Sequence, residues 1–285
     1  MVKRLIAAAL LFTMPAFAAP LQPDDIVKAA PKSDWQVLDP NDLLVMQLPT
    51  GRAVIQLAPG FAPRSIANIR KLARSEPWSK HSAIIRVQDN YVVQWSHDPE
   101  GPPTGKGWAE FDRAVTPSFH ALADADGYAP QAGFDNGFPA ASDGKREWLV
   151  HCYGAVGVGR DLKADTGDGS ELYAVIGQAP RHLDRNITVV GRVVQGMELL
   201  SSLPRGGQTM GFYSKGQKHV PIQFLSIAAD MYPEGRPRLE ALKTDSKSFA
   251  AYAAARRNRG GPFFVRPAGH IDVCNIPLPV RPLKP

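Results

Sequence analysis

Short apolar runs alternate with turn residues in the first half of the chain. Residues 44–48 and 52–57 are apolar runs separated by Pro-Thr-Gly, which predicts a β-hairpin. Residues 83–87 and 91–95 repeat this pattern around a polar turn. Between the two pairs, residues 63–75 begin with proline and carry apolar side chains at helical spacing, so we expect a helix there.

The second half of the chain continues the pattern of short strands. A short helix is predicted near residues 196–203, and further strands are predicted at 148–158, 172–176, 187–190, 192–194 and 220–229. Many strands with two separated helices fit a closed antiparallel barrel or a sandwich. The proline content supports this interpretation, because 26 prolines in 285 residues disfavour long helices.

Three further segments lie outside this strand-rich pattern. Residues 19–43 form an N-terminal extension with one short helix at 23–30. Residues 98–148 are rich in Gly, Pro and Asp and predict an irregular but ordered surface insertion, because they hold several aromatic side chains. Residues 231–285 form a C-terminal extension, with an Ala-rich helix within 239–259 and an extended Pro-rich end.

The N-terminus has the three parts of a secretory signal. Lys3 and Arg4 precede the apolar run 5–12, and an Ala-Phe-Ala cleavage site ends at Ala18. A membrane anchor is the alternative, but the apolar run is too short to cross ~30 Å of hydrocarbon. We therefore expect residues 1–18 to be removed and the mature protein to be soluble in the periplasm of a Gram-negative bacterium, without membrane insertion.

Charge and motif content exclude several kinds of chemistry. The net charge of +6 is spread along the chain without a cationic block, so no nucleic-acid partner is predicted. The seven histidines lack metal-binding spacing, and no serine-hydrolase elbow is present. His151 adjoins Cys152, but neighbouring side chains in a strand point to opposite faces, which disfavours a catalytic pair. We expect no metal and no cofactor.

The two cysteines can stabilise an exported protein. Cys152 and Cys274 are the only cysteines, and we predict that they pair and tie the C-terminal extension to the barrel. Two buried free thiols are the alternative.

Arg86 is an unusual residue within its predicted strand. It lies among Ala, Ile and Val side chains, and Gln94 follows eight residues later in the next strand. An arginine in a strand is most often solvated or paired on an outer face. The motifs around Arg86 favour a functional role at a solvent-open site.

Three stretches together carry a family resemblance. They are Val54-Ile-Gln-Leu-Ala-Pro with Ala62-Pro-Arg-Ser-Ile-Ala-Asn-Ile, then Ile85-Arg86-Val87 with Tyr91-Val-Val-Gln94, and then Gly169-Ser-Glu-Leu-Tyr173 with His182-Leu-Asp and Val190-Gly-Arg-Val-Val-Gln-Gly196-Met. In order and approximate spacing, residues 44–228 resemble the cyclophilin-type peptidyl-prolyl isomerases. The resemblance implies a mainly β domain at 44–230, an eight-stranded closed antiparallel barrel capped by two helices.

The resemblance also implies a site and an activity. Arg86 matches the family's catalytic arginine, and the expected partners are proline-containing segments of exported proteins, whose X-Pro bonds would be isomerised. Gln94 and the main chain near Gly159 and Arg160 would bind the substrate backbone. The proline pocket would be walled by Tyr91, Val92, Tyr173 and Leu183, with His182 at a position where many members have Trp or Phe.

Several positions depart from the family pattern. Ile85 replaces the histidine before the arginine, Trp95 and Ser96 replace two glycines, Glu171 replaces a glutamine, and Ile187 lies at a pocket histidine position. A non-catalytic module that binds Pro-containing segments, as a chaperone or assembly factor, is therefore the alternative function.

Overall fold

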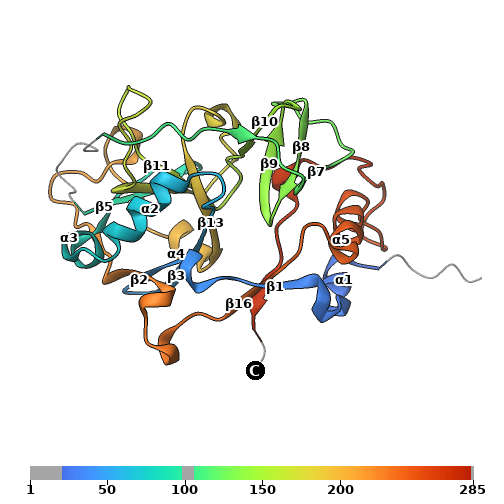
Figure 1. The fold of residues 1–285 in the computed structure, drawn as a ribbon, viewed down its shortest axis with the longest axis horizontal. Helices are drawn as coiled ribbons and strands as arrows, with labels where there is room; N and C mark the ends of the chain where they lie inside the picture. Colours follow the sequence, from blue (N-terminus) through green and yellow to red (C-terminus); the bar gives the residue numbers. More distant parts are fainter. Residues whose placement is uncertain (1–20, 98–105, 284–285) are drawn as a thin grey trace, which may run out of the picture.

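A computed structural model of the chain describes residues 21–97 and 106–283. The predicted signal peptide at 1–18 lies outside these residues. Within them the strands form three antiparallel sheets of nine, five and three strands. Figure 1 shows the largest sheet on one side of the molecule, and the strands of residues 119–149 and the helices of the two terminal extensions on the opposite side.

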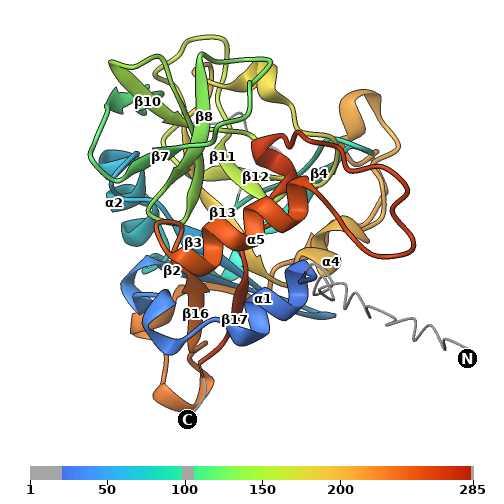
Figure 2. The same ribbon diagram turned by 90° about the vertical axis from the view of Figure 1, so that its right-hand side faces the viewer.

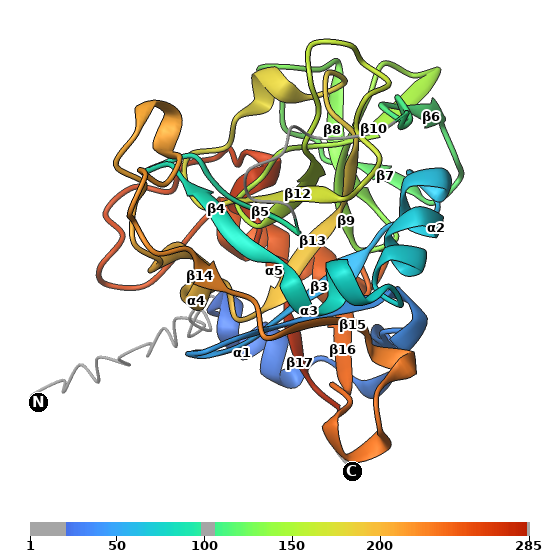
Figure 3. The same cartoon turned by 90° about the vertical axis from the view of Figure 1, so that its left-hand side faces the viewer.

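The largest sheet contains nearly all the strands predicted for the barrel. Its strands are β2 (Leu43–Leu48), β3 (Gly51–Leu57), β4 (Ala83–Val87), β5 (Val92–Ser96), β11 (Ala155–Val158), β12 (Glu171–Val175), β13 (Val189–Gln195), β14 (Val220–Pro221) and β15 (Phe224–Ile227). They are hydrogen-bonded in the order β14-β4-β5-β12-β11-β13-β3-β2-β15. Figure 3 shows β4, β5 and β12 side by side on the face that carries the candidate site.

One chain segment closes this sheet into a barrel. β14 and β15 lie at opposite ends of the strand order, yet only two residues separate them in the chain. The amide of Ile222 donates to Ser82 beside β4 (2.9 Å), and the amide of Gln223 donates to Gln47 in β2 (2.8 Å). When 220–227 is counted as one bent strand, the nine strands become eight, and the predicted mainly β barrel is confirmed.

Helices cover the barrel core at the predicted positions. α2 (Pro63–Leu72) buries Ile66 and Ile69, and α4 (Met197–Ser201) buries Leu200 against the same core. Fully burying one such side chain stabilises the fold by about 1.5–3 kcal/mol. A third helix, α3 (Glu76–His81), places Trp78 in this core as well.

The structure corrects the prediction for the 98–148 insertion. Its described part is a five-stranded antiparallel sheet instead of an irregular segment. β8 and β9 are joined by Asn136 and Gly137, which both have positive φ (46° and 83°), as a tight hairpin turn requires. The strands are β6 (Arg113–Ala114), β7 (Phe119–Ala121), β8 (Gln131–Asp135), β9 (Phe138–Ser142) and β10 (Arg146–Leu149). The predicted strand 148–158 is therefore divided between β10 and β11.

The two extensions fold together. β16 (Leu239–Leu242) lies between β1 (Trp35–Val37) and β17 (Val280–Pro282) in the three-stranded sheet. Figure 2 shows α1 (Pro23–Ala29) beside α5 (Lys247–Arg257), below the insertion sheet. The predicted helices at 23–30 and within 239–259 are thus present, but residues 239–242 form a strand.

The insertion and the extensions share a second hydrophobic core. Phe134 of β8 meets Phe249 of α5 edge to face, with ring centroids 4.9 Å apart. Trp35 and Trp148 belong to the same cluster. The second core therefore combines residues from the N-terminal extension, the insertion and the C-terminal extension, which are far apart in the sequence.

A disulfide joins Cys152 to Cys274, with their Cα atoms 5.0 Å apart. Cys152 follows β10, and Cys274 lies in a short 3-10 helix of the C-terminal extension. The bond ties this extension to the segment between the insertion sheet and the barrel. No helix in residues 21–97 or 106–283 is long and apolar enough to cross a membrane.

Candidate functional site

Strand register places the main predicted site residues in one row. Arg86 of β4 lies opposite Gln94 of β5, Gln94 lies opposite Tyr173 of β12, and Tyr173 lies opposite Gly157 of β11. Directly opposite residues share one face of a sheet. Because Val93 points into the barrel core, Gln94 and its row face outward.

The Arg86 guanidinium is held by three acceptors. Its Nε donates to the carbonyl of Met210 (2.6 Å), one Nη donates to Oε1 of Gln94 (3.1 Å), and the other Nη donates to Oε1 of Gln88. The residue is only 8% exposed, and burial lowers the pKa of its guanidinium. The site is thus less solvent-open than the sequence suggested.

Two aromatic rings lie beside the same guanidinium. Its carbon lies 5.5 Å from the Tyr91 ring centroid and 5.2 Å from that of Phe212. Phe212 also forms an isolated β-bridge with Arg86. The sequence analysis missed Met210 and Phe212, because they approach from an irregular segment far along the chain.

Glu171 extends the polar row beyond Gln94. Nε2 of Gln94 donates to Oε1 of Glu171, so Gln94 joins the guanidinium to a carboxyl group. Burial raises the pKa of Glu171, while the hydrogen bond from Gln94 and the nearby Arg86 act in the opposite direction. Gln94 is therefore fixed in orientation, with its amide oxygen toward Arg86.

The row opens into a pocket of about 100 Å³. Eight of the nine residues predicted for the site line it, and Ile187 lines it as well. The lining residues are Arg86, Tyr91, Val92, Gln94, Gly159, Arg160, Tyr173, Leu183 and Ile187. His182 is the exception: its side chain is exposed on a 3-10 helix and does not line the pocket. His182 and Leu183 are adjacent in that helix, so their side chains point in different directions. Leu183 faces the pocket and His182 faces solvent.

The Tyr173 ring crosses the barrel surface over a glycine. A Cβ atom at Gly157 would lie 2.3 Å from Cζ of Tyr173, so any side chain there would displace the ring. The Tyr173 hydroxyl lies 2.9 Å from Nε2 of His151. Burial raises the pKa of this phenol, which keeps it neutral at physiological pH.

Behind Tyr173, a buried polar network fixes the histidine. Nδ1 of His151 lies 2.9 Å from Oδ1 of Asp184, and Nε of Arg181 donates to Oδ2 of Asp184 at 2.6 Å. The other nitrogens of Arg181 donate to Asp126 at 2.9 and 3.0 Å. The sequence placed His151 in a strand; the structure places it in the turn before β11, where it supports the pocket wall.

The chemistry of this pocket comes from a fixed cation, an amide and apolar walls. A guanidinium has five N–H donors, and the three hydrogen bonds of Arg86 leave two for a bound group. Tyr91, Val92, Leu183 and Ile187 supply nonpolar surface. In the described ranges, no group of three or more His, Cys, Asp or Glu residues is placed to hold a metal ion.

Comparisons with known proteins agree on one family. The family described as "Cyclophilin type peptidyl-prolyl cis-trans isomerase/CLD" matches residues 43–226. Proteins of Brucella suis and Brucella melitensis, each named "Probable peptidyl-prolyl cis-trans isomerase", are 25% identical over 170 residues, which is 60% of this chain and 75% of theirs. The crystal structure of cyclophilin AquaCyp293 from Hirschia baltica is similar in fold. Its TM-score is 0.71 at 22% identity, over 90% of this chain and 96% of that one.

Proposed function

Because this chain belongs to the cyclophilin-type peptidyl-prolyl cis-trans isomerase family, we propose that it accelerates exchange at X-Pro bonds and that Arg86 stabilises the transition state. One observation carries the assignment to Arg86. The guanidinium, Gln94 and the Tyr173 ring share one row and line one pocket, although they come from three strands.

The proposed reaction breaks no covalent bond, because it is a rotation about the X-Pro peptide bond. Amide resonance produces a rotation barrier of ~18–20 kcal/mol, and spontaneous X-Pro exchange takes tens to hundreds of seconds. A hydrogen bond to the prolyl nitrogen favours its pyramidal form and reduces that resonance. The two remaining donors of Arg86 can supply this bond and hold the substrate carbonyl, because a guanidinium presents its donors as a rigid fork.

The walls of the pocket support this role. Val92 and Tyr173 are buried, and their nonpolar atoms can hold a proline ring while the acyl side rotates. Arg160 stands at the rim with its guanidinium bonded to the carbonyls of Asp161, Leu162 and Asn186. These bonds order the loop beside Gly159, where we propose that the substrate backbone binds.

We place the activity outside the cytoplasm, on polypeptides that have been exported. The signal-like N-terminus at 1–18 supports this location, and so does the Cys152–Cys274 disulfide, because such bonds persist in oxidising compartments.

A protease-free exchange assay on an X-Pro peptide tests the proposal. Arg86→Ala should lower kcat/KM by one to three orders of magnitude, about 1.4–4 kcal/mol of transition-state stabilisation. Arg86→Lys should recover little of this loss, because an ammonium lacks the planar fork. Arg74→Ala removes an exposed arginine outside the pocket and should keep full activity.

Two results would contradict this proposal. Wild-type protein that binds proline peptides without accelerating exchange would be a binding module. Full activity in Arg86→Ala, with its fold checked by circular dichroism, would leave the family assignment intact but reject the role of Arg86.

A further inference from the structure

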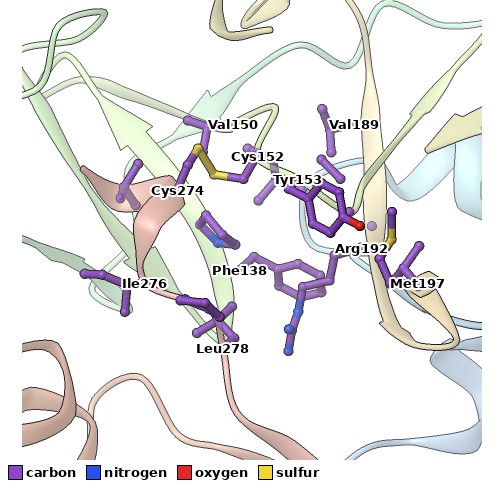
Figure 4. Close-up of a pocket in the computed structure, with 18 residues that line it drawn as sticks. Phe138, Val150, Cys152, Tyr153, Val189, Arg192, Met197, Cys274, Ile276 and Leu278 are labelled. Carbon is purple, nitrogen blue, oxygen red and sulfur yellow. A yellow bond between two sulfur atoms is a disulfide. The ribbon is translucent and has the colours of Figure 1, made fainter. Parts of the chain in front are cut away.

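A second pocket lies between the barrel, the insertion sheet and the C-terminal extension. It has a volume of about 230 Å³ and shares no lining residue with the Arg86 pocket. β9, β11 and β13 supply one part of its wall, and residues 273–278 supply another. Figure 4 shows the Cys152–Cys274 disulfide toward one end and the Arg192 side chain toward the other.

Of the lining residues in the described part of the chain, Arg192 alone carries a charged side chain. Its Nε and one Nη are shielded from solvent and have no hydrogen-bond partner within the described ranges. Gln56 lies opposite Arg192 in the β3–β13 register, but Oε1 of Gln56 also has no partner, so it does not accept from the guanidinium. Burial without a neighbouring acid lowers the pKa of Arg192 to about 9.

Arg192 as a whole is half-buried, but polar nitrogens that are shielded from water and lack a hydrogen-bond partner are energetically unfavourable. Among the described residues, its guanidinium lies close to the Phe138 ring, whose centroid is 5.8 Å away. A ring face attracts a cation only weakly compared with a carboxylate. The guanidinium therefore keeps its capacity to bind an anion.

The rest of the lining is mainly nonpolar. Leu149, Met197, Ile276 and Leu278 supply aliphatic surface. Tyr153 is 52% exposed, so it stands at the mouth of the pocket, and its hydroxyl is directed toward the Arg192 and Met197 side. A ligand that fits must combine a nonpolar body with one negative group at the Arg192 end.

We infer that this second pocket binds a small organic monoanion with a nonpolar body, such as a medium-chain carboxylate. The carboxylate accepts hydrogen bonds from the Arg192 guanidinium, and the chain lies against the nonpolar wall toward the disulfide. This combination of one placed charge and an apolar concave wall is typical of small-molecule sites. The inference does not depend on the proposed isomerase activity.

Calorimetric titration of the full chain with octanoate tests this inference. Octanoate should bind with a dissociation constant of about 1 mM or below, whereas octylamine, with the same chain and the opposite charge, should not bind. Arg192→Met should weaken octanoate binding about tenfold or more, and Arg192→Lys should retain part of it. Arg86→Ala should bind octanoate like the wild type, because the two pockets are separate.

Three outcomes would overturn the inference. They are no octanoate binding to the wild type, equal binding of octanoate and octylamine, and loss of octanoate binding in Arg86→Ala. The first two use unmodified protein, so they remain decisive even if an Arg192 variant does not fold.

Discussion

The Tyr173 hydroxyl lies 2.9 Å from Nε2 of His151, so a residue that walls the Arg86 pocket is hydrogen-bonded to a fully buried imidazole. Asp184 holds the other ring nitrogen of that imidazole. The position of the Tyr173 ring is therefore set from behind the pocket as well as by packing within it.

Tyr173→Phe should destabilise the protein while keeping the pocket wall. The variant keeps the ring but leaves a buried nitrogen of His151 without its partner, which costs about 1–3 kcal/mol in the free energy of unfolding. Urea denaturation measures this loss. Tyr232→Phe is the matched control, because Tyr232 is 86% exposed and should tolerate the same change. Equal stability of the two variants would show that the Tyr173–His151 bond contributes nothing.

Glu171→Gln should change how stability depends on pH. Burial raises the pKa of Glu171 above its ordinary value of 4.5, so the folded state binds this proton more tightly than the unfolded state does. Stability from this group is present at low pH and decreases as pH rises from 4.5 through the folded-state pKa. Glu171→Gln removes this titrating group, so its stability should not fall in this way. Its free energy of unfolding should therefore increase relative to that of the wild type as pH rises. Parallel stability profiles in urea denaturation between pH 4 and 8 would contradict the expectation.

Loss of the disulfide should destabilise the chain in a redox-dependent way. Cys152 and Cys274 are 122 residues apart, and closing a loop of that length stabilises the fold by about 5 kcal/mol at most. Reduction should therefore lower the melting temperature of the wild type. The Cys152→Ser/Cys274→Ser double variant should have a lower melting temperature than the oxidised wild type, with or without reductant. Two free thiols in the unreduced, unfolded wild type would exclude the bond.

Arg113→Met should be strongly destabilising. Arg113 donates to Asp135 (2.6 Å), to Glu147 (2.8 Å) and to the carbonyl of Gly60 (2.7 Å), and both carboxylates are fully buried. Removing the cation leaves two buried acids with the Thr116 hydroxyl beside them but without a compensating charge, at a cost of about 3–5 kcal/mol.

Arg146→Met is the control for Arg113→Met. Arg146 pairs with Asp112 at the surface, and its side chain is 46% exposed, so its loss should cost about 1 kcal/mol or less. Denaturant unfolding of both variants compares them directly. Equal losses would mean that the two buried carboxylates do not depend on the Arg113 cation.

Much of the barrel could be predicted from local patterns. The hairpin at residues 44–57 and the helix at 63–75 follow from apolar periodicity and turn residues, and the pairing of Arg86 with Gln94 follows from the motif spacing. The Asn136-Gly137 hairpin was also accessible to sequence analysis, because this dipeptide is a strong turn signal.

Other features depend on contacts between remote segments. β16 is buried at all four positions, so it lacks the alternation that marks a half-exposed strand. Its formation depends on β1 and β17, which are far away in sequence. The bond from Arg86 to the Met210 carbonyl likewise joins a side chain to a backbone atom, which leaves no residue-type signal. The outward direction of the His182 side chain could not be predicted, because sequence spacing does not define which way a short 3-10 helix turns its side chains.

The order of synthesis constrains how this chain can reach its final state. A ribosome releases β2 and β4 long before the segment 220–227 that pairs with both, and Trp35 long before its partner Leu242. Phe134 is likewise synthesised long before Phe249, whose ring it contacts in the folded protein. Both hydrophobic cores therefore stay open to water until the C-terminal strands and α5 emerge, and such partly formed chains are prone to aggregate. A chain that ends before residue 220 therefore lacks parts of both cores.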